Sequence, residues 1–229
     1  MNKLQAIIFD FDGVVADNEP VHCLMFQRVL GEIGIFLSEE EYYAEYLGYD
    51  DKGCFAAVLA ARGRPAPQST VNELVQRKAA IYLEHIRSNL VIFPGVRELV
   101  REAAAQCRLA IASGALRHEI EFILEAAGLR KEFEHITSSE DVRRGKPDPE
   151  GYLHALAALN RLRPTEVIAA AHCLVIEDSI PGIRAGHAAG MQVLAVSNTH
   201  AATDLREADH VVTSLAEVQL GDLEHRLFG

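Results

Sequence analysis

Short runs of apolar residues recur along the chain and predict buried β-strands. The first run is Ala6–Phe9, similar runs cover 109–112, 173–176 and 193–196, and a weaker one covers 210–213. In the four stronger runs the apolar residues follow one another without polar ones between them, which is typical of strands covered on both faces. The pattern therefore predicts a parallel sheet at the centre of the protein.

Helical periodicity fills the stretches between these runs. Apolar residues at positions i, i+3, i+4 and i+7 predict helices over 96–104 and over 120–127, where Gly128 is the stop. Further helices are expected over 149–159 and over a short stretch that ends near Gly190. Strands that alternate with helices favour an α/β fold with right-handed crossovers. We therefore expect a doubly wound, Rossmann-like parallel sheet as the main domain.

One region interrupts this alternation. From residue 19 to residue 87 the chain carries helical patterns, separated by glycine and proline residues, and no convincing buried strand. We interpret this region as a second, smaller helical domain inserted after the first strand. The expected domains are a discontinuous α/β core over 1–16 and 92–229 and a helical cap over 17–91.

Composition and charge narrow the class of protein. Of the 229 residues, 49% are hydrophobic and 24% are charged, as in ordinary globular proteins. With 22 Lys and Arg against 33 Asp and Glu, the net charge is −11, which disfavours a nucleic acid or an anionic membrane as partner. No apolar run approaches the ~18 residues of a membrane span, and the first residues lack the layout of a signal peptide. The four cysteines form no C-x-x-C pair and are expected to be inert thiols, so we expect a cytoplasmic protein.

Polar residues stand directly after several of the predicted strands. Asp10-Phe11-Asp12-Gly13 follows the first strand, Ser113-Gly114 the second, and Glu177-Asp178-Ser179 the run at 173–176, while Lys146 precedes a later helix. Each alone has an ordinary explanation as a turn, a helix cap, a charge pair at a helix start or a solvated lysine. Because ligands bind at the carboxyl ends of parallel strands, their common placement indicates one site.

This set of residues resembles the four motifs of the haloacid-dehalogenase superfamily. The motifs read Asp10-x-Asp12-Gly13, Ser113-Gly114, Lys146-Pro147 and Glu177-Asp178-Ser179. The resemblance covers essentially the whole chain, including a helical cap inserted after the first motif. The stretches 10–22 and 175–186 are similar to the branch that contains sugar-phosphate phosphatases and β-phosphoglucomutases.

The resemblance implies a role for each motif. Asp10 would be the nucleophile that forms an aspartyl-phosphate, and Asp12 would protonate the leaving group and then activate the attacking water. Dehalogenases of this superfamily lack an aspartate at the position of Asp12, so its presence favours phosphoryl transfer to or from oxygen. Lys146 would hold the nucleophile and the phosphoryl group, and Ser113, Gly114 and nearby N–H groups would cradle the phosphate.

A magnesium ion is the expected cofactor. A carboxylate that attacks a phosphoryl group must overcome the repulsion between their negative charges, and a divalent cation together with a lysine can cancel that repulsion. Mg²⁺ prefers oxygen ligands, and the Asp10 and Asp178 carboxylates at neighbouring strand ends suit it. In the family the backbone carbonyl at the position of Asp12 is a further ligand. Glu177 would lie at the edge of the metal site.

For four residues of the predicted cap the sequence also predicts a role or a place. Glu19 and His22 stand at the start of the first cap helix, in positions similar to those of the family, and are candidates for substrate binding. Arg77 and Lys78 are expected on a solvated helix face. The histidines show no H-x-H or H-E-x-x-H pattern, and no nucleotide-binding glycine motif occurs, so chemistry based on a histidine-bound metal or a nucleotide cofactor is not expected.

These observations predict a Mg²⁺-dependent phosphatase for a small phosphorylated metabolite, above all a sugar phosphate. A mutase of the β-phosphoglucomutase type shares every core residue and is the alternative, and a non-catalytic protein that binds a phosphorylated metabolite is the alternative of another class. Asp50 and Asp51 stand where the first cap loop of these mutases carries an arginine for a second phosphate, which disfavours the mutase. Lys52 or Lys78 could compensate for that arginine. We expect a monomer.

Overall fold

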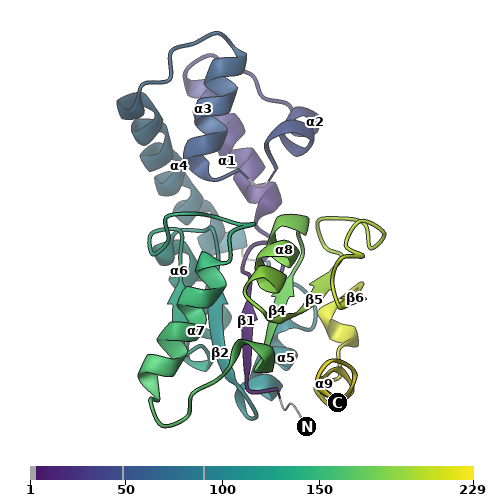
Figure 1. Ribbon diagram of the computed structural model, residues 1–229. Helices are drawn as coiled ribbons and strands as arrows, with labels where there is room; N and C mark the ends of the chain where they lie inside the picture. The colour runs from purple at the N-terminus through teal and green to yellow at the C-terminus, as the bar shows by residue number, and fades with distance from the viewer. Residues whose placement is uncertain (1–3, 48, 90) are drawn as a thin grey trace. The chain divides into compact units, whose positions relative to one another are not determined.

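The chain folds into two structural units. The structure, a computed structural model, describes residues 4–47, 49–89 and 91–229. One unit comprises Met1–Asp17 together with Val91–Gly229, and the other comprises Asn18–Leu90. The first is built around a sheet, and the second consists of helices and loops with no strand among its described residues (Figure 1). The roles expected for the two units, a catalytic core and a cap, stay predictions.

A six-stranded parallel sheet forms the centre of the larger unit. Its strands are β1 (Ala6–Phe9), β2 (Arg108–Ala112), β3 (His135–Thr137), β4 (Cys173–Glu177), β5 (Gln192–Val196) and β6 (His210–Val212). Every residue of β1, β2 and β4 is buried, which confirms that the continuous apolar runs form a sheet covered on both faces. The strand β3 was not predicted, because it has only three residues and two of them are polar.

The order of the strands reverses beside β1. The sheet runs β3-β2-β1-β4-β5-β6, so the chain moves from β1 outward to β3 and then returns to place β4 on the other side of β1. Phe9 pairs with Ile111 of β2 and with Ile176 of β4. The residues that follow these three strands therefore meet at one edge of the sheet. In doubly wound sheets this reversal point is where ligands bind.

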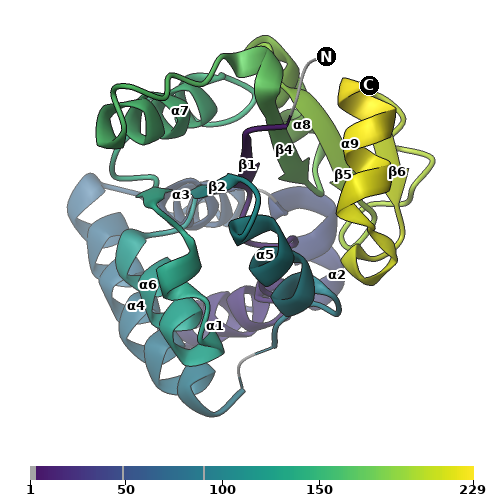
Figure 2. The ribbon, with the colours of Figure 1, turned by 90° about the horizontal axis from the view of Figure 1, so that it is seen from below.

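Helices cover both faces of this sheet (Figure 2). They are α5 (Val96–Ala104), α6 (Arg117–Ala127), α7 (Glu150–Leu162), α8 (Ile180–Ala188) and α9 (Leu220–Phe228), with short 3₁₀ turns at Arg130–Glu132, Ala170–His172 and Leu215–Glu217. Tyr152 of α7 and Ile183 of α8 pack against Ala6 and Ile8 of β1 in one hydrophobic cluster. The helix α5 contacts α9 on the opposite face. Gly128 ends α6 with a φ of 69°, as predicted.

The chain leaves the larger unit and returns to it at one place. The N–H of Asp17 donates to the carbonyl of Val91 at 3.0 Å, and the N–H of Phe93 donates to the carbonyl of Val15 at 3.2 Å. Between these bonds Ala16 and Ile92 form an antiparallel bridge. The two connections to the inserted unit are thus hydrogen-bonded to each other.

The smaller unit has a hydrophobic core of its own. Its elements are α1 (Glu19–Glu32), α2 (Glu39–Glu41), a π-helical turn (Tyr42–Tyr46), α3 (Asp51–Ala61) and α4 (Gln68–Asn89). Phe26 of α1, Phe55 of α3 and Leu74 of α4 are buried together in this core. The helical character predicted for the region is confirmed for the residues described. None of the helices in the described part of the chain combines the length and the apolar composition that a membrane crossing requires.

Candidate active site

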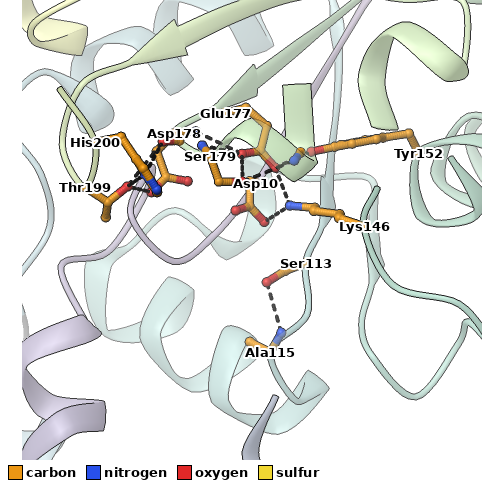
Figure 3. A network of polar contacts seen from close by, with 11 residues as sticks. Asp10, Ser113, Ala115, Lys146, Tyr152, Glu177, Asp178, Ser179, Thr199 and His200 are labelled. Atoms are coloured by element: carbon orange, nitrogen blue, oxygen red, sulfur yellow. Dashed lines mark hydrogen bonds and ion pairs between the residues drawn. The ribbon is translucent and has the colours of Figure 1, made fainter. Parts of the chain in front are cut away.

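Three carboxylates gather at the edge of the sheet where the strand order reverses. Asp10 follows β1, Glu177 is the last residue of β4, and Asp178 follows it (Figure 3). One oxygen from each carboxylate lies within 4.8 Å of the others. The three residues are 7%, 0% and 5% exposed, respectively. The structure thus brings together residues that the sequence singled out by their place at the ends of two strands and by their resemblance to two motifs.

Lys146 supplies the positive charge of this cluster. It lies in the loop before α7, its Nζ is 2.7 Å from Oδ1 of Asp10, and it also forms an ion pair with Glu177. Burial alone would lower the pKa of this ammonium group, but the two carboxylates outweigh burial and raise the pKa above its usual value. Lys146 is therefore held charged, directly against the expected nucleophile.

The cluster holds more negative charge than Lys146 offsets. With all three carboxylates ionised, they and the one ammonium would carry a net charge of 1 − 3 = −2 in a buried site. Burial raises the pKa of Asp10 even though Lys146 opposes the rise, and burial together with the charges of Glu177 and Asp10 raises the pKa of Asp178. A divalent cation would remove this excess charge, and carboxylate oxygens are the ligands that Mg²⁺ accepts. The residues present therefore fit a magnesium ion.

Glu177 differs from the other two carboxylates because its acceptor positions are already filled. Its Oε1 accepts from Lys146 and from the Tyr152 hydroxyl at 2.8 Å. Its Oε2 accepts from the N–H groups of Asp178 and Ser179 and from the Ser179 hydroxyl, each at 2.9 Å. Burial alone would raise the pKa of Glu177, but Lys146 and these hydrogen bonds lower it. This arrangement suits a side chain that orients Lys146, whereas a direct metal ligand would need an oxygen that is not already hydrogen-bonded. The expectation that Glu177 lies at the edge of a metal site stays a prediction.

The turn after β1 lies directly against Asp178. Asp12 is half-buried in this turn and forms an isolated bridge with Ala16. Gly13 has a φ of 80°, and a Cβ atom at this position would lie 2.0 Å from Oδ2 of Asp178. A side chain here would meet both backbone strain and a collision, so glycine is required for the close approach. The expected roles of Asp12, as acid–base group and carbonyl ligand, stay predictions.

Ser113 and Gly114 lie at the same edge of the sheet, after β2. Ser113 is buried, its N–H donates to the carbonyl of Thr137 at 3.0 Å, and its Oγ accepts from the N–H of Ala115 at 3.1 Å. Gly114 is exposed. Figure 3 shows Ser113, Asp10 and Lys146 at the same edge of the sheet. The geometry is compatible with the predicted phosphate cradle, which remains a prediction.

The two candidate substrate residues of the inserted unit make contacts within that unit. Glu19, in the first turn of α1, accepts a hydrogen bond from the Tyr42 hydroxyl at 2.5 Å. His22 Nδ1 lies 2.7 Å from Nζ of Lys78, and its ring stacks on Tyr82 with 4.7 Å between centroids. Burial, and secondarily the charge of Lys78, holds the pKa of His22 well below its usual value. His22 is therefore a neutral ring in this structure, and its role in substrate binding is still a prediction.

The prediction that Lys78 lies on a solvated face is wrong. Lys78 is fully buried, its Nζ lies 4.3 Å from the centre of the Phe26 ring, and it forms an ion pair with Asp51 at the start of α3. A lysine can be buried when an acidic partner and an aromatic face compensate for lost water, and here α3 and α1 supply them. Its neighbour Arg77 is exposed as predicted and pairs with Glu32 at 2.8 Å.

Sequence reasoning missed two sets of contacts at the carboxylate cluster. The loop after β5 contacts Asp178 through Thr199 and His200, and it contacts the neighbouring turn at Gly13 through Asn198. The helix α7 contacts Glu177 through the Tyr152 hydroxyl. For the loop a signal was present, because these polar residues directly follow the apolar run at 193–196. For Tyr152 no signal was present, because an aromatic residue in a helix is usually part of the core.

Comparisons with known proteins agree with this geometry. A family model described as haloacid dehalogenase-like hydrolase matches residues 4–190. Protein CbbY of Rhodobacter capsulatus is 33% identical over 199 residues, which cover 84% of this chain and 85% of that protein. Hexitol phosphatase B of Escherichia coli K12 is 29% identical over 224 residues, which cover 96% of this chain and 97% of that protein.

A solved structure shows the same architecture. The crystal structure of an Asp-to-Asn mutant of CbbY from Rhodobacter sphaeroides, in complex with xylulose 1,5-bisphosphate, aligns with a TM-score of 0.85 and 25% sequence identity, over 96% of this chain and 99% of that one. The family model spans all four motifs, and the first relative covers most of both chains. The chain therefore belongs to the haloacid dehalogenase-like hydrolase family.

Proposed function

We propose that the protein is a Mg²⁺-dependent phosphatase that hydrolyses a small phosphorylated metabolite, a sugar phosphate or a related polyol phosphate. The observation that carries this proposal is the Asp10–Lys146 pair, 2.7 Å apart, inside a buried carboxylate cluster with excess negative charge. Membership of a hydrolase family and the similarity to hexitol phosphatase B over nearly the full length support it.

In the first step Asp10 acts as the nucleophile. A carboxylate oxygen of Asp10 attacks the phosphorus atom, and the bond between phosphorus and the substrate oxygen breaks. Asp12, two residues further along the turn, gives its proton to the departing oxygen and becomes a carboxylate. The products of this step are the free alcohol and a phosphoryl group bonded to Asp10.

In the second step water releases the phosphate. The Asp12 carboxylate takes a proton from a water molecule while that water attacks phosphorus, and the bond to Asp10 breaks. Inorganic phosphate leaves, Asp10 is a carboxylate again, and Asp12 is protonated for the next cycle. The same side chain thus serves as acid and then as base.

The positive charges of the site make the first step feasible. The nucleophile and the phosphoryl group are both anionic, and Lys146, whose ammonium lies 2.7 Å from Asp10, offsets part of that charge. A magnesium ion held by the carboxylates of Asp10 and Asp178 would supply the remaining positive charge and bind a phosphoryl oxygen. Glu177 keeps the ammonium in place through its ion pair.

The inserted unit favours the phosphatase over the mutase. Asp50 caps α3 by accepting from the N–H of Gly53 at 2.7 Å, and Asp51 pairs with Lys78. The charge of Lys78 is thus already offset by an aspartate, and the loop that carries the arginine in the mutases presents two acidic residues instead. Because Lys78 is paired with Asp51, it is not available to hold a second phosphate, which a mutase has to bind.

Phosphate release from a panel of substrates tests the proposal. The protein is treated with a chelator and assayed with and without Mg²⁺ on hexose and hexitol phosphates, a pentulose bisphosphate, phosphoglycolate and nucleoside monophosphates. We expect Mg²⁺-dependent release from sugar or polyol phosphates. The Asp10→Asn variant should release none, while Asp222→Asn, which makes the same change at an exposed position of α9, should behave as the wild type.

Two outcomes would contradict the proposal. If no substrate releases phosphate, or if Asp10→Asn matches the wild type, the Asp10 phosphatase mechanism is wrong. If β-glucose 1-phosphate with a trace of the 1,6-bisphosphate is converted to glucose 6-phosphate with little free phosphate, the protein is a mutase.

A further inference from the structure

The loop after β5 contacts both parts of the candidate metal site. Asn198 Nδ2 donates to the carbonyl oxygen of Gly13 at 2.7 Å, in the turn that follows β1. The Thr199 hydroxyl donates to Oδ2 of Asp178, and it lies 3.2 Å from the carbonyl oxygen of the same residue. The loop therefore links the turn of the first motif to the aspartate of the fourth. Figure 3 shows the contacts of Thr199 and His200 with Asp178.

Two neighbours fix the position of Oδ2 of Asp178. Thr199 contacts it from the β5 loop, and Gly13 lies so close that a Cβ atom would be 2.0 Å away. The printed hydrogen bond of Thr199 goes to Oδ2, and the other carboxylate oxygen, Oδ1, lies further from Gly13, at 3.1 Å from such a Cβ atom. Since Asp178 contributes an oxygen to the group that lies within 4.8 Å of the oxygens of Asp10 and Glu177, fixing one oxygen determines the direction in which the other points.

His200 orients the Thr199 hydroxyl in turn. Its Nδ1 lies 3.1 Å from the Thr199 Oγ1 and 3.2 Å from the carbonyl oxygen of Asp178. If Nδ1 carries the proton, the threonine oxygen accepts from His200 and its hydrogen is directed to Asp178. A hydroxyl with one acceptor contact and one donor contact has a single preferred orientation.

We propose that Thr199 is a positioning residue that holds the Asp178 carboxylate in the orientation needed to bind the divalent cation. This inference rests on the proposed function, which assigns a magnesium ion to Asp10 and Asp178. A side chain that hydrogen-bonds a metal-binding carboxylate fixes its orientation, and loss of such a partner typically lowers metal affinity by about 10- to 100-fold. The inference adds to the four sequence motifs a residue from the loop after β5, which carries none of them.

Metal affinity measured without substrate tests the inference. The chelator-treated protein is titrated with Mn²⁺, and bound metal is followed by electron paramagnetic resonance and by calorimetry. We expect Thr199→Val to bind Mn²⁺ about 10-fold or more weakly than the wild type, because it removes the hydroxyl and keeps the branched shape. Thr199→Ser, which keeps a hydroxyl, should restore most of the affinity. Thr203→Val makes the same change at an exposed threonine of the same loop and should bind as the wild type does.

Kinetics separate positioning from a general structural role. At saturating Mg²⁺ the kcat of Thr199→Val should approach that of the wild type, while the Mg²⁺ concentration for half-maximal rate should rise with the loss of affinity. Thr199→Ala removes the same hydroxyl and takes the place of Thr199→Val if that variant does not fold. If Thr199→Val or Thr199→Ala is folded and binds Mn²⁺ as tightly as the wild type does, the inference is wrong. The phosphatase proposal is not affected by that result. A wild type that binds no Mn²⁺ and releases no phosphate would overturn both.

Discussion

Replacement of Lys146 by methionine tests the charge balance of the candidate site. Methionine has a similar length and apolar character along the stem, so the change removes mainly the ammonium group. With Asp10, Glu177 and Asp178 all ionised, the cluster then carries a net charge of −2 − 1 = −3. We expect a variant that is less stable without metal and much less active with it.

The size of both effects follows from the geometry. At the 2.7 Å between Nζ and Asp10 Oδ1, the Coulomb attraction is about 6 kcal/mol at an effective dielectric constant of ~20. Desolvation of the two groups opposes this attraction, and removal of one partner of a buried pair typically costs about 3–5 kcal/mol of stability. In the reaction, loss of a charged group that stabilises the transition state costs about 3–4 kcal/mol, or about 10²- to 10³-fold in kcat.

The assay compares unfolding with and without magnesium. Urea denaturation of Lys146→Met is measured in a chelator and in saturating Mg²⁺, beside Lys131→Met, which makes the same change at an exposed position. We expect the loss of stability in Lys146→Met to shrink when Mg²⁺ is present, because the cation neutralises the carboxylates. The reasoning is refuted if the loss is the same in both conditions, or if it does not exceed that of Lys131→Met.

Three further variants probe other members of the site. Asp10→Asn should fold as the wild type does, as judged by circular dichroism, and lack turnover, because it removes the nucleophile; substantial turnover would exclude Asp10 from that role. Asp12→Ala should lower the rate on alkyl phosphates by about 10²- to 10⁴-fold but form the phosphoenzyme normally from p-nitrophenyl phosphate, whose leaving group needs no proton; an equal defect on both substrates would assign Asp12 another role. Tyr152→Phe removes the hydroxyl that donates to buried Glu177 at 2.8 Å and should cost about 1–3 kcal/mol of stability in denaturant titrations. The exposed Tyr49→Phe serves as its control, and an equal effect of the two changes would contradict the importance of that hydrogen bond.

The sequence was sufficient to predict that Asp10 and Glu177 lie close together, because the relevant signals are local. A buried strand can be predicted from its own run of apolar residues, and Asp10 and Glu177 stand at the ends of such strands. Because β1 and β4 are predicted to be parallel strands of one sheet, their carboxyl ends are expected to lie at the same edge, and the pairing of Phe9 with Ile176 confirms this. In contrast, β3 has too few residues and too little apolar character to be recognised from the sequence.

Other features depend on contacts between distant parts of the chain. The burial of Lys78 requires Asp51, 27 positions away, and the aromatic ring of Phe26 on another helix. The contact of Thr199 with Asp178 requires that the loop after β5 turn back toward β4. Lys78 does not differ locally from an ordinary surface lysine. Thr199 is marked only by its place after the apolar run at 193–196, and that place does not show which residue it contacts.

The hydrogen-bonded pair of connections at 15–17 and 91–93 makes the inserted unit an exchangeable part. Because the two ends of the insert are already side by side, its length and internal sequence can vary with little strain on the strands that carry Asp10. Loop-closure entropy also grows slowly with the length of an insert, so a larger or smaller one changes folding cost only modestly. Under the proposed function, replacement of the insert would therefore leave the residues expected to break the phosphate bond as they are.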